Sequence, residues 1–120
     1  MIESVKYDRY SVLSMQFEEL DFIKTPRVSA VIKEKLEEIG YGNIILDINN
    51  LDYIDSTGMS SLINISRRIK DKNNEMVVVC NSAKTLQLFD IAKMGNFFKI
   101  FETIDAAEAY LKTRKSSAPI

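Results

Sequence analysis

A nearly continuous apolar run in the middle of the chain constrains the fold more than any other feature of the sequence. The run is Ile44-Ile45-Leu46-Asp47-Ile48, and such a run is typical of a strand in a sheet that helices cover on both faces. A second apolar run over 76–80 predicts another buried strand. An amphipathic helix is predicted between them, over roughly 58–71. Strand–helix–strand order of this kind predicts a right-handed crossover between parallel strands.

The rest of the chain fits the same layout. We predict strands over 2–7, 10–18 and 97–101, a helix that starts near Thr25 and is stopped by Gly40 and Gly42, and helices near 83–94 and over about 104–113. The predicted fold is a single α/β domain with a mixed β-sheet flanked by helices, in the order β-β-α-β-α-β-α-β-α. We expect this domain to span residues 1–114 and to be followed by a tail without stable structure over 115–120.

Composition excludes several classes of function. The chain has 120 residues, which suits one domain, and 16 basic against 17 acidic side chains give a net charge of −1 with no basic face. Direct nucleic-acid binding therefore has little support. The longest apolar runs are too short to span a membrane, and the charged beginning of the chain is unlike a signal peptide. We expect a cytoplasmic protein that does not insert into membranes.

The side chains used most often in catalysis are scarce. The sequence has no histidine, which removes the usual acid–base group at neutral pH and the commonest metal ligand. Cys80 is the single cysteine, so no internal disulfide can form, and a buried thiol in an apolar strand is an inert small hydrophobe. We expect neither enzymatic activity, nor a cofactor, nor a bound metal.

A polar string marks the start of the helix predicted after strand 44–48. It reads Asp55-Ser56-Thr57-Gly58. Backbone N–H groups at a helix start are unpaired and favour an anion, so phosphorylation there would change the surface charge without breaking the fold. The alternative is simple helix capping by these oxygens. Gly58 disfavours plain capping, because glycine in a first turn costs up to about 1 kcal/mol relative to alanine, and it suggests that something approaches the backbone closely.

A second acidic loop is predicted near this string. The loop at 19–21 follows strand 10–18, and the connection at 52–58 follows strand 44–48. Loops at the carboxyl ends of parallel strands meet at one edge of a sheet. If the two strands point the same way, Asp21, Asp55 and Ser56 share one surface.

These residues resemble a known family. The string Asp55-Ser56-Thr57-Gly58-Met59, the upstream Glu19-Leu20-Asp21 and the element order are similar to STAS-domain anti-sigma factor antagonists of bacteria, over residues 2 to about 113. The resemblance implies that Ser56 is phosphorylated by an anti-sigma factor Ser/Thr kinase with a histidine-kinase-like ATPase fold. It also implies a partner-binding surface made of Asp21, Asp55, Ser56, Thr57, Gly58, Met59 and Ser60.

The resemblance further implies a cycle of partner exchange. The unphosphorylated form would bind the kinase and release a sigma factor or another client, phosphorylation at Ser56 would abolish that binding, and a phosphoserine phosphatase would reset the cycle. Glu18 and Ser60 stand where the family commonly has glycine. Because they add charge and bulk to the expected surface, we expect a specialised cognate partner.

Other functions remain open from the sequence. Ser56 could be a helix cap that is never modified, in a STAS interaction subunit of a signalling or lipid-transport assembly. In an enzyme that used Asp21, Asp55 and Ser56, the serine nucleophile would need an adjacent base, and the only candidates for that base in this set are carboxylates. Nucleotide binding at the helix start would lack a glycine-rich phosphate loop.

Overall fold

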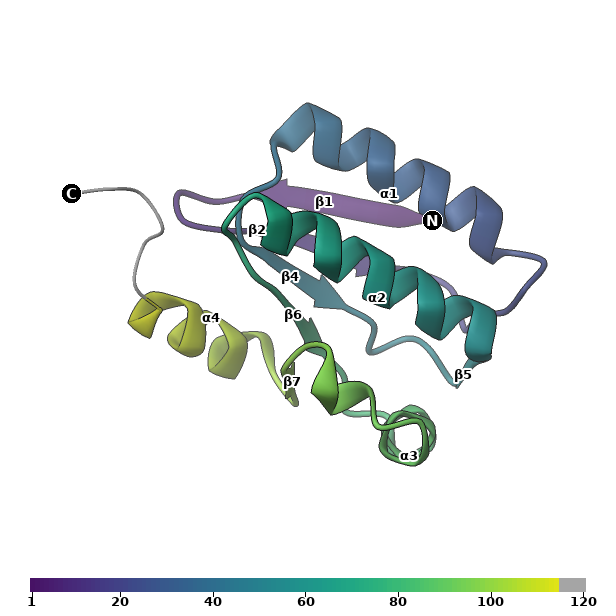
Figure 1. Ribbon diagram of the computed structural model, residues 1–120. Helices are drawn as coiled ribbons and strands as arrows, with labels where there is room; N and C mark the ends of the chain where they lie inside the picture. The colour runs from purple at the N-terminus through teal and green to yellow at the C-terminus, as the bar shows by residue number, and fades with distance from the viewer. Residues whose placement is uncertain (115–120) are drawn as a thin grey trace.

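A five-stranded mixed sheet organises the computed structural model, which describes residues 1–114 (Figure 1). The strands are β1 (Ile2–Lys6), β2 (Ser11–Met15), β4 (Ile44–Asp47), β6 (Met76–Val79) and β7 (Ile100–Phe101), in the spatial order β1-β2-β4-β6-β7. β1 is antiparallel to β2, and the other neighbours are parallel. The predicted α/β domain with a mixed sheet is therefore confirmed. The tail predicted over 115–120 lies outside the described residues.

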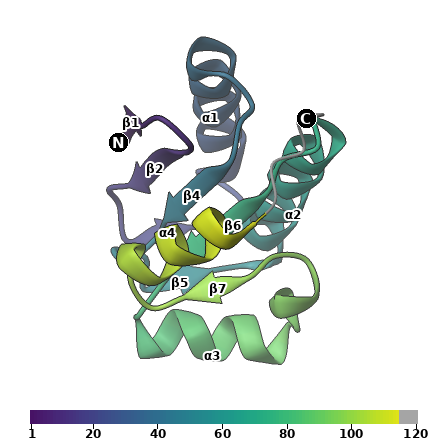
Figure 2. The ribbon, with the colours of Figure 1, turned by 90° about the vertical axis from the view of Figure 1, so that its left-hand side faces the viewer.

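Helices cover both faces of this sheet. They are α1 (Thr25–Ile39), α2 (Ser56–Asp71), α3 (Ala83–Ile91) and α4 (Ile104–Thr113), and a 3-10 turn, η1 (Met94–Asn96), follows α3. α1 and α2 lie side by side on one face, and α4 packs against β4, β6 and β7 on the other (Figures 1 and 2). No helix within residues 1–114 is long and apolar enough to cross a membrane.

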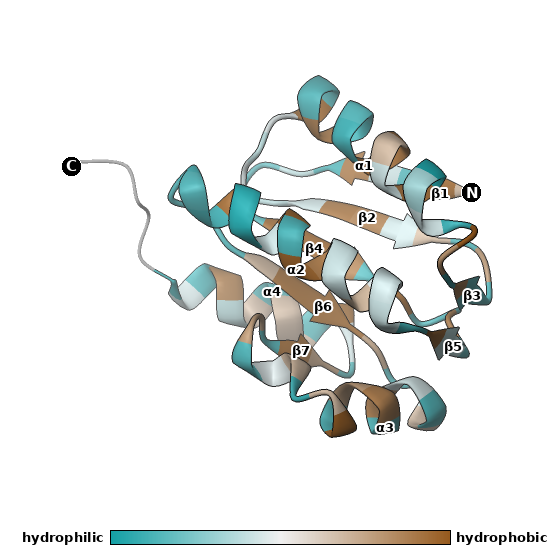
Figure 3. Cartoon of the chain, turned by 45° about the vertical axis from the view of Figure 1, so that its right-hand side comes forward, coloured by the Kyte–Doolittle hydropathy of each residue, from teal (hydrophilic) through white to brown (hydrophobic). Residues whose placement is uncertain are grey.

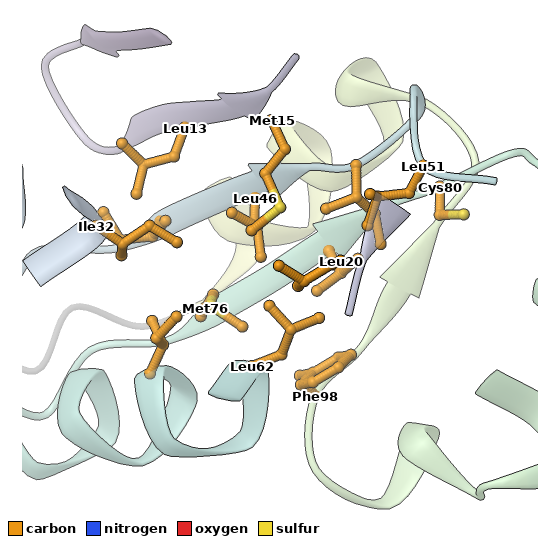
Figure 4. Packing of buried hydrophobic residues seen from close by; sticks show 14 of the residues in the cluster. Leu13, Met15, Leu20, Ile32, Leu46, Leu51, Leu62, Met76, Cys80 and Phe98 are labelled. Carbon is orange, nitrogen blue, oxygen red and sulfur yellow. The ribbon is translucent and has the colours of Figure 1, made fainter. Parts of the chain in front are cut away.

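The side chains of the strands alternate between two apolar clusters. On β2, β4 and β6, the side chains of Leu13, Leu46 and Val78 join the larger cluster beneath α1 and α2 (Figure 4). Ile45 and Val77 join a smaller cluster beneath α4. Because neighbouring residues of a strand point to opposite faces, β4 and β6, which are covered on both faces, are apolar along almost their whole length. In Figure 3, β4 and β6 are accordingly coloured as mainly hydrophobic.

Two short strands were not predicted from the sequence. β3 (Glu19–Leu20) and β5 (Tyr53–Ile54) form a separate parallel pair, where the sequence predicted a loop and a connection. The predicted element order therefore lacks these two strands. β2 and β4 are parallel neighbours, so the segments that follow them also lie side by side and form backbone hydrogen bonds. One of these bonds runs from the Asp55 N–H to the Leu20 carbonyl, at 3.2 Å. A strand of two residues is too short to leave a periodic pattern.

Several element ends differ from their predicted positions. α2 begins at Ser56 rather than near 58, because the preceding residue caps it. α3 ends at Ile91, since Lys93 adopts a left-handed conformation with φ of 55° that no α-helix continues. The last strand is limited to β7, because the chain first passes through η1. The final helix lies where it was predicted, over 104–113.

Candidate functional site

Asp55 is the residue that caps α2. Its Oδ1 accepts a hydrogen bond from the Gly58 N–H at 2.9 Å, which is the standard contact of an N-cap side chain. Ser56 is the first residue of the helix, and its side chain is exposed. Its hydroxyl forms no hydrogen bond with any other group of residues 1–114. The capping role that the sequence left open for the hydroxyls therefore belongs to Asp55, and Ser56 is not needed for it.

The start of α2 can receive an anion. The N–H of Gly58 is used by the cap, and the Met59 N–H donates to the Asp55 carbonyl at 2.9 Å. The backbone N–H groups of Ser56 and Thr57 have no partner within the described chain. Two free N–H groups at the positive end of a helix dipole favour negative charge beside the Ser56 hydroxyl.

Asp55 also joins this helix start to the loop between β3 and α1. Its second oxygen, Oδ2, accepts from the Phe22 N–H at 2.8 Å. In that loop Asp21 Oδ1 accepts from the N–H groups of Ile23 and Lys24, at 3.1 and 3.0 Å. The carboxylates of Asp21 and Asp55 therefore hold the backbone of the loop and of the helix start in place, and they also carry negative charge. The predicted adjacency of the two acidic loops is confirmed by the hydrogen bond between them.

The loop presents two large apolar side chains to solvent. Phe22 is 66% exposed and Ile23 is 74% exposed, and Tyr53 on β5 is 46% exposed. Exposed apolar side chains gathered at one place mark an interaction surface more often than scattered ones do. Their exposure was not predicted from the sequence. The sequence does place two bulky apolar residues in a short loop between the acidic residue Asp21 and the helix that begins near Pro26. Few neighbouring residues can cover side chains in so short a loop, and this could have indicated their exposure.

The predicted position of Gly58 on the surface is wrong. Gly58 is buried, and a Cβ atom added to it would lie 2.5 Å from the Leu20 carbonyl oxygen and 2.8 Å from Ile54 Cγ1. The close approach inferred from the sequence is real, but the group that approaches is the protein's own β3–β5 pair (Figure 3). Gly58 therefore cannot touch a partner and serves to seat α2 on these two strands.

The remaining predicted contact residues differ in accessibility. Thr57 and Ser60 are exposed, whereas Met59 is half-buried and packs against the main apolar cluster. The side chain of Glu18 is exposed, and its carbonyl accepts from the Asp52 N–H at 2.7 Å. The surface around Ser56 thus combines small hydroxyls with acidic side chains and the apolar loop. We name Phe22, Ile23, Tyr53, Ser56 and Ser60 the switch surface.

The shifted pKa values elsewhere in the protein arise from burial and from hydrogen bonds within the fold. Burial raises the pKa of the Cys80 thiol, as expected for an inert thiol inside a strand. The Tyr10 hydroxyl donates to the Glu108 carboxylate, which raises the pKa of Tyr10 to about 12. Among residues 1–114, no three acidic or cysteine side chains gather as a metal site would require.

Comparison with known proteins identifies the class. A family model for the STAS domain matches residues 1–107, so the chain belongs to the STAS domain family, and the resemblance read from the sequence is confirmed. The chain is 26% identical over 74 residues to BtrV of Bordetella bronchiseptica, which is provisionally named an anti-sigma factor antagonist. That match covers 62% of this chain and 64% of BtrV, which is less than two-thirds of the relative's length.

Solved structures share the fold. An anti-sigma factor antagonist from Mycobacterium paratuberculosis is similar with a TM-score of 0.81 at 18% identity, and the match covers 93% of each chain. The unphosphorylated form of SpoIIAA is similar with a TM-score of 0.73 at 17% identity, over 97% of this chain and all of that one (100%). The phosphorylated form of SpoIIAA, from Bacillus, is similar with a TM-score of 0.63 at 19% identity, and the match covers 95% of this chain and 100% of that chain. At such identities these likenesses concern the fold alone.

Proposed function

We propose that this protein is a phosphorylation-controlled anti-sigma factor antagonist. In its unphosphorylated form it binds an anti-sigma Ser/Thr kinase through the switch surface and so releases a sigma factor or another client. Phosphorylation of Ser56 abolishes this binding, and a phosphoserine phosphatase restores it. The cycle takes place in the cytoplasm, and the protein itself carries out no catalysis.

The observation that carries this proposal is the free hydroxyl of Ser56. Asp55 already caps α2, so the exposed hydroxyl has no structural task and can be modified at little cost in stability. A phosphoryl group there can accept from the unpartnered N–H groups of Ser56 and Thr57. Family membership over residues 1–107 and the relatives named as anti-sigma factor antagonists support the same function.

Phosphoryl transfer from the cognate kinase tests the proposal directly. We expect the kinase and ATP to add one phosphate to the wild-type protein, on Ser56, and none to Ser56→Ala. Thr57→Ala is the matched control, because it removes the neighbouring exposed hydroxyl and should still receive one phosphate, on Ser56. Mass spectrometry of peptides locates the phosphate.

Two other outcomes of this assay have clear meanings. Label that persists in Ser56→Ala would place the acceptor at another residue. A wild-type protein that binds the kinase without ever being labelled would contradict the switch and favour an unmodified interaction subunit.

The apolar part of the switch surface should supply much of the binding energy. We expect Phe22→Ser and Ile23→Ser each to weaken kinase binding by about 30-fold, because truncating a central apolar contact at an interface costs about 2 kcal/mol or more. Both side chains are mainly exposed, so the melting temperature should change little. Calorimetric titration against the kinase measures the loss.

Ile91→Ser supplies the control for this experiment. Ile91 is 72% exposed on α3, which matches Ile23 in size and exposure but lies outside the switch surface. Its replacement should leave kinase affinity unchanged. Equal losses in Ile23→Ser and Ile91→Ser would show that the loop is not a specific contact.

A further inference from the structure

A notch separates α1 from α2 on the face of the sheet that both helices cover. The two helices spread apart toward their C-terminal ends (Figure 2). Where they meet, Ser29 Oγ lies 2.7 Å from Ser61 Oγ. Beyond this contact the opening has a volume of about 210 Å³. We name it the α1–α2 notch.

The notch has an apolar floor and a basic rim. One turn beyond each serine, Ile32 and Ile65 form the buried floor, and Lys33 and Arg68 line the notch from opposite helices with exposed side chains. An apolar floor beneath charged groups is the lining expected of a site that orients an amphipathic ligand.

The two cations on the rim are free to pair with a ligand. Within the described residues the ion pairs are Lys112 with Glu108 and Arg114 with Glu75, all remote from the notch. Neither Lys33 nor Arg68 forms an ion pair with another side chain of residues 1–114. A carboxylate seated between them would gain charge-assisted hydrogen bonds from both sides.

The serine pair adds a donor at the narrow end. Only one of the two hydroxyls can donate along the Ser29–Ser61 contact, so the accepting hydroxyl keeps its own hydrogen. Ser61 is 8% exposed, and within residues 1–114 no other hydrogen bond of either hydroxyl is formed. The notch therefore offers polar contact at its closed end as well as at its rim.

We infer that the α1–α2 notch binds a small carboxylate with a short apolar tail. The tail would lie on Ile32 and Ile65, and the carboxylate would lie between Lys33 and Arg68. The volume is below the roughly 300–1,000 Å³ of pockets for drug-sized ligands, so a short aliphatic acid fits better than a nucleotide or a long lipid chain. The notch does not include Ser56, and binding should be independent of phosphorylation.

Titration with hexanoate, followed by NMR of the isotope-labelled full chain, tests this inference. We expect millimolar affinity, as suits so small a ligand, with amide shifts concentrated at the notch residues of α1 and α2. Hexanol, which keeps the tail and lacks the charge, should bind about tenfold more weakly. Arg68→Gln should lower the affinity for hexanoate by a similar factor.

Arg67→Gln is the matched control, because Arg67 is also exposed on α2 but does not line the notch. It should leave the affinity for hexanoate unchanged. The inference is overturned if the shifts spread over the whole surface, if hexanol binds as well as hexanoate, or if Arg67→Gln weakens binding as much as Arg68→Gln. Shifts confined to the switch surface would also overturn it, since they would place the ligand at the other site.

Discussion

Phosphorylation of Ser56 is expected to weaken binding to the anti-sigma kinase by about a thousandfold, which corresponds to about 4 kcal/mol. The modification adds a charge of about −1.5 to −2 at neutral pH. It does so beside Asp55, whose carboxylate oxygens already accept from Gly58 and Phe22. A partner shaped for a neutral hydroxyl therefore meets both a clash and added negative charge. Size-exclusion chromatography of mixtures before and after stoichiometric phosphorylation measures the loss.

The same modification should leave the fold intact. The N–H groups of Ser56 and Thr57 can donate hydrogen bonds to the phosphate, and a helix start gains at most about 1–2 kcal/mol from an added anion. We expect the melting temperature of the phosphorylated protein to stay near that of the unmodified protein. A large fall in melting temperature would mean that partner release follows from local unfolding.

Replacement of Gly58 by alanine is expected to lower the free energy of unfolding by about 2 kcal/mol. Its Cβ would lie 2.5 Å from the Leu20 carbonyl oxygen, and backbone cannot move aside as a flexible side chain can. Because the contact is with backbone, the cost of overpacking should lie at the upper end of its usual range, about 3 kcal/mol. The better helix propensity of alanine offsets about 1 kcal/mol of that cost. Thermal unfolding should show a fall of roughly 8 °C in melting temperature.

Gly95→Ala controls for the general effect of losing a glycine. No atom of residues 1–114 lies within 4 Å of a Cβ added at Gly95, so this variant should keep or slightly raise the melting temperature. Gly58→Arg should destabilise more than Gly58→Ala, contrary to the expectation for a glycine on the surface. If Gly58→Ala unfolded at the wild-type temperature, the tight contact between α2 and the β3–β5 pair would be disproved.

The layers of the fold could be predicted from the sequence because they leave long periodic patterns. The runs at 44–48 and 76–80 are apolar on both faces except at Asp47, and the helix at 104–113 keeps its stripe over its full length. β3 and β5 could not be predicted, because their two residues each are held by backbone pairing that any sequence could make. Pairing of this kind depends on where β2 and β4 end, which only the assembled sheet determines.

The site could be predicted only where local sequence patterns determine it. The Asp55–Ser56 string marks a helix start through local chemistry, and the parallel arrangement of β2 and β4 brings Asp21 close to it. Whether Gly58 faces solvent or strand depends on the β3–β5 pair, which the sequence did not reveal. The exposure of Phe22 and Ile23 likewise depends on the absence of a covering element, and a local pattern does not report that.

One calorimetric experiment tests the electrostatic switch at Ser56 most directly. The unmodified protein, Ser56→Asp and the phosphorylated protein are each titrated against the same kinase under the same salt conditions. We expect affinity to fall in that order, because a carboxylate brings one charge and two acceptor oxygens where phosphoserine brings nearly two charges and three oxygens. Equal affinity for all three forms would contradict the account and leave Ser56 as an exposed residue without a regulatory role.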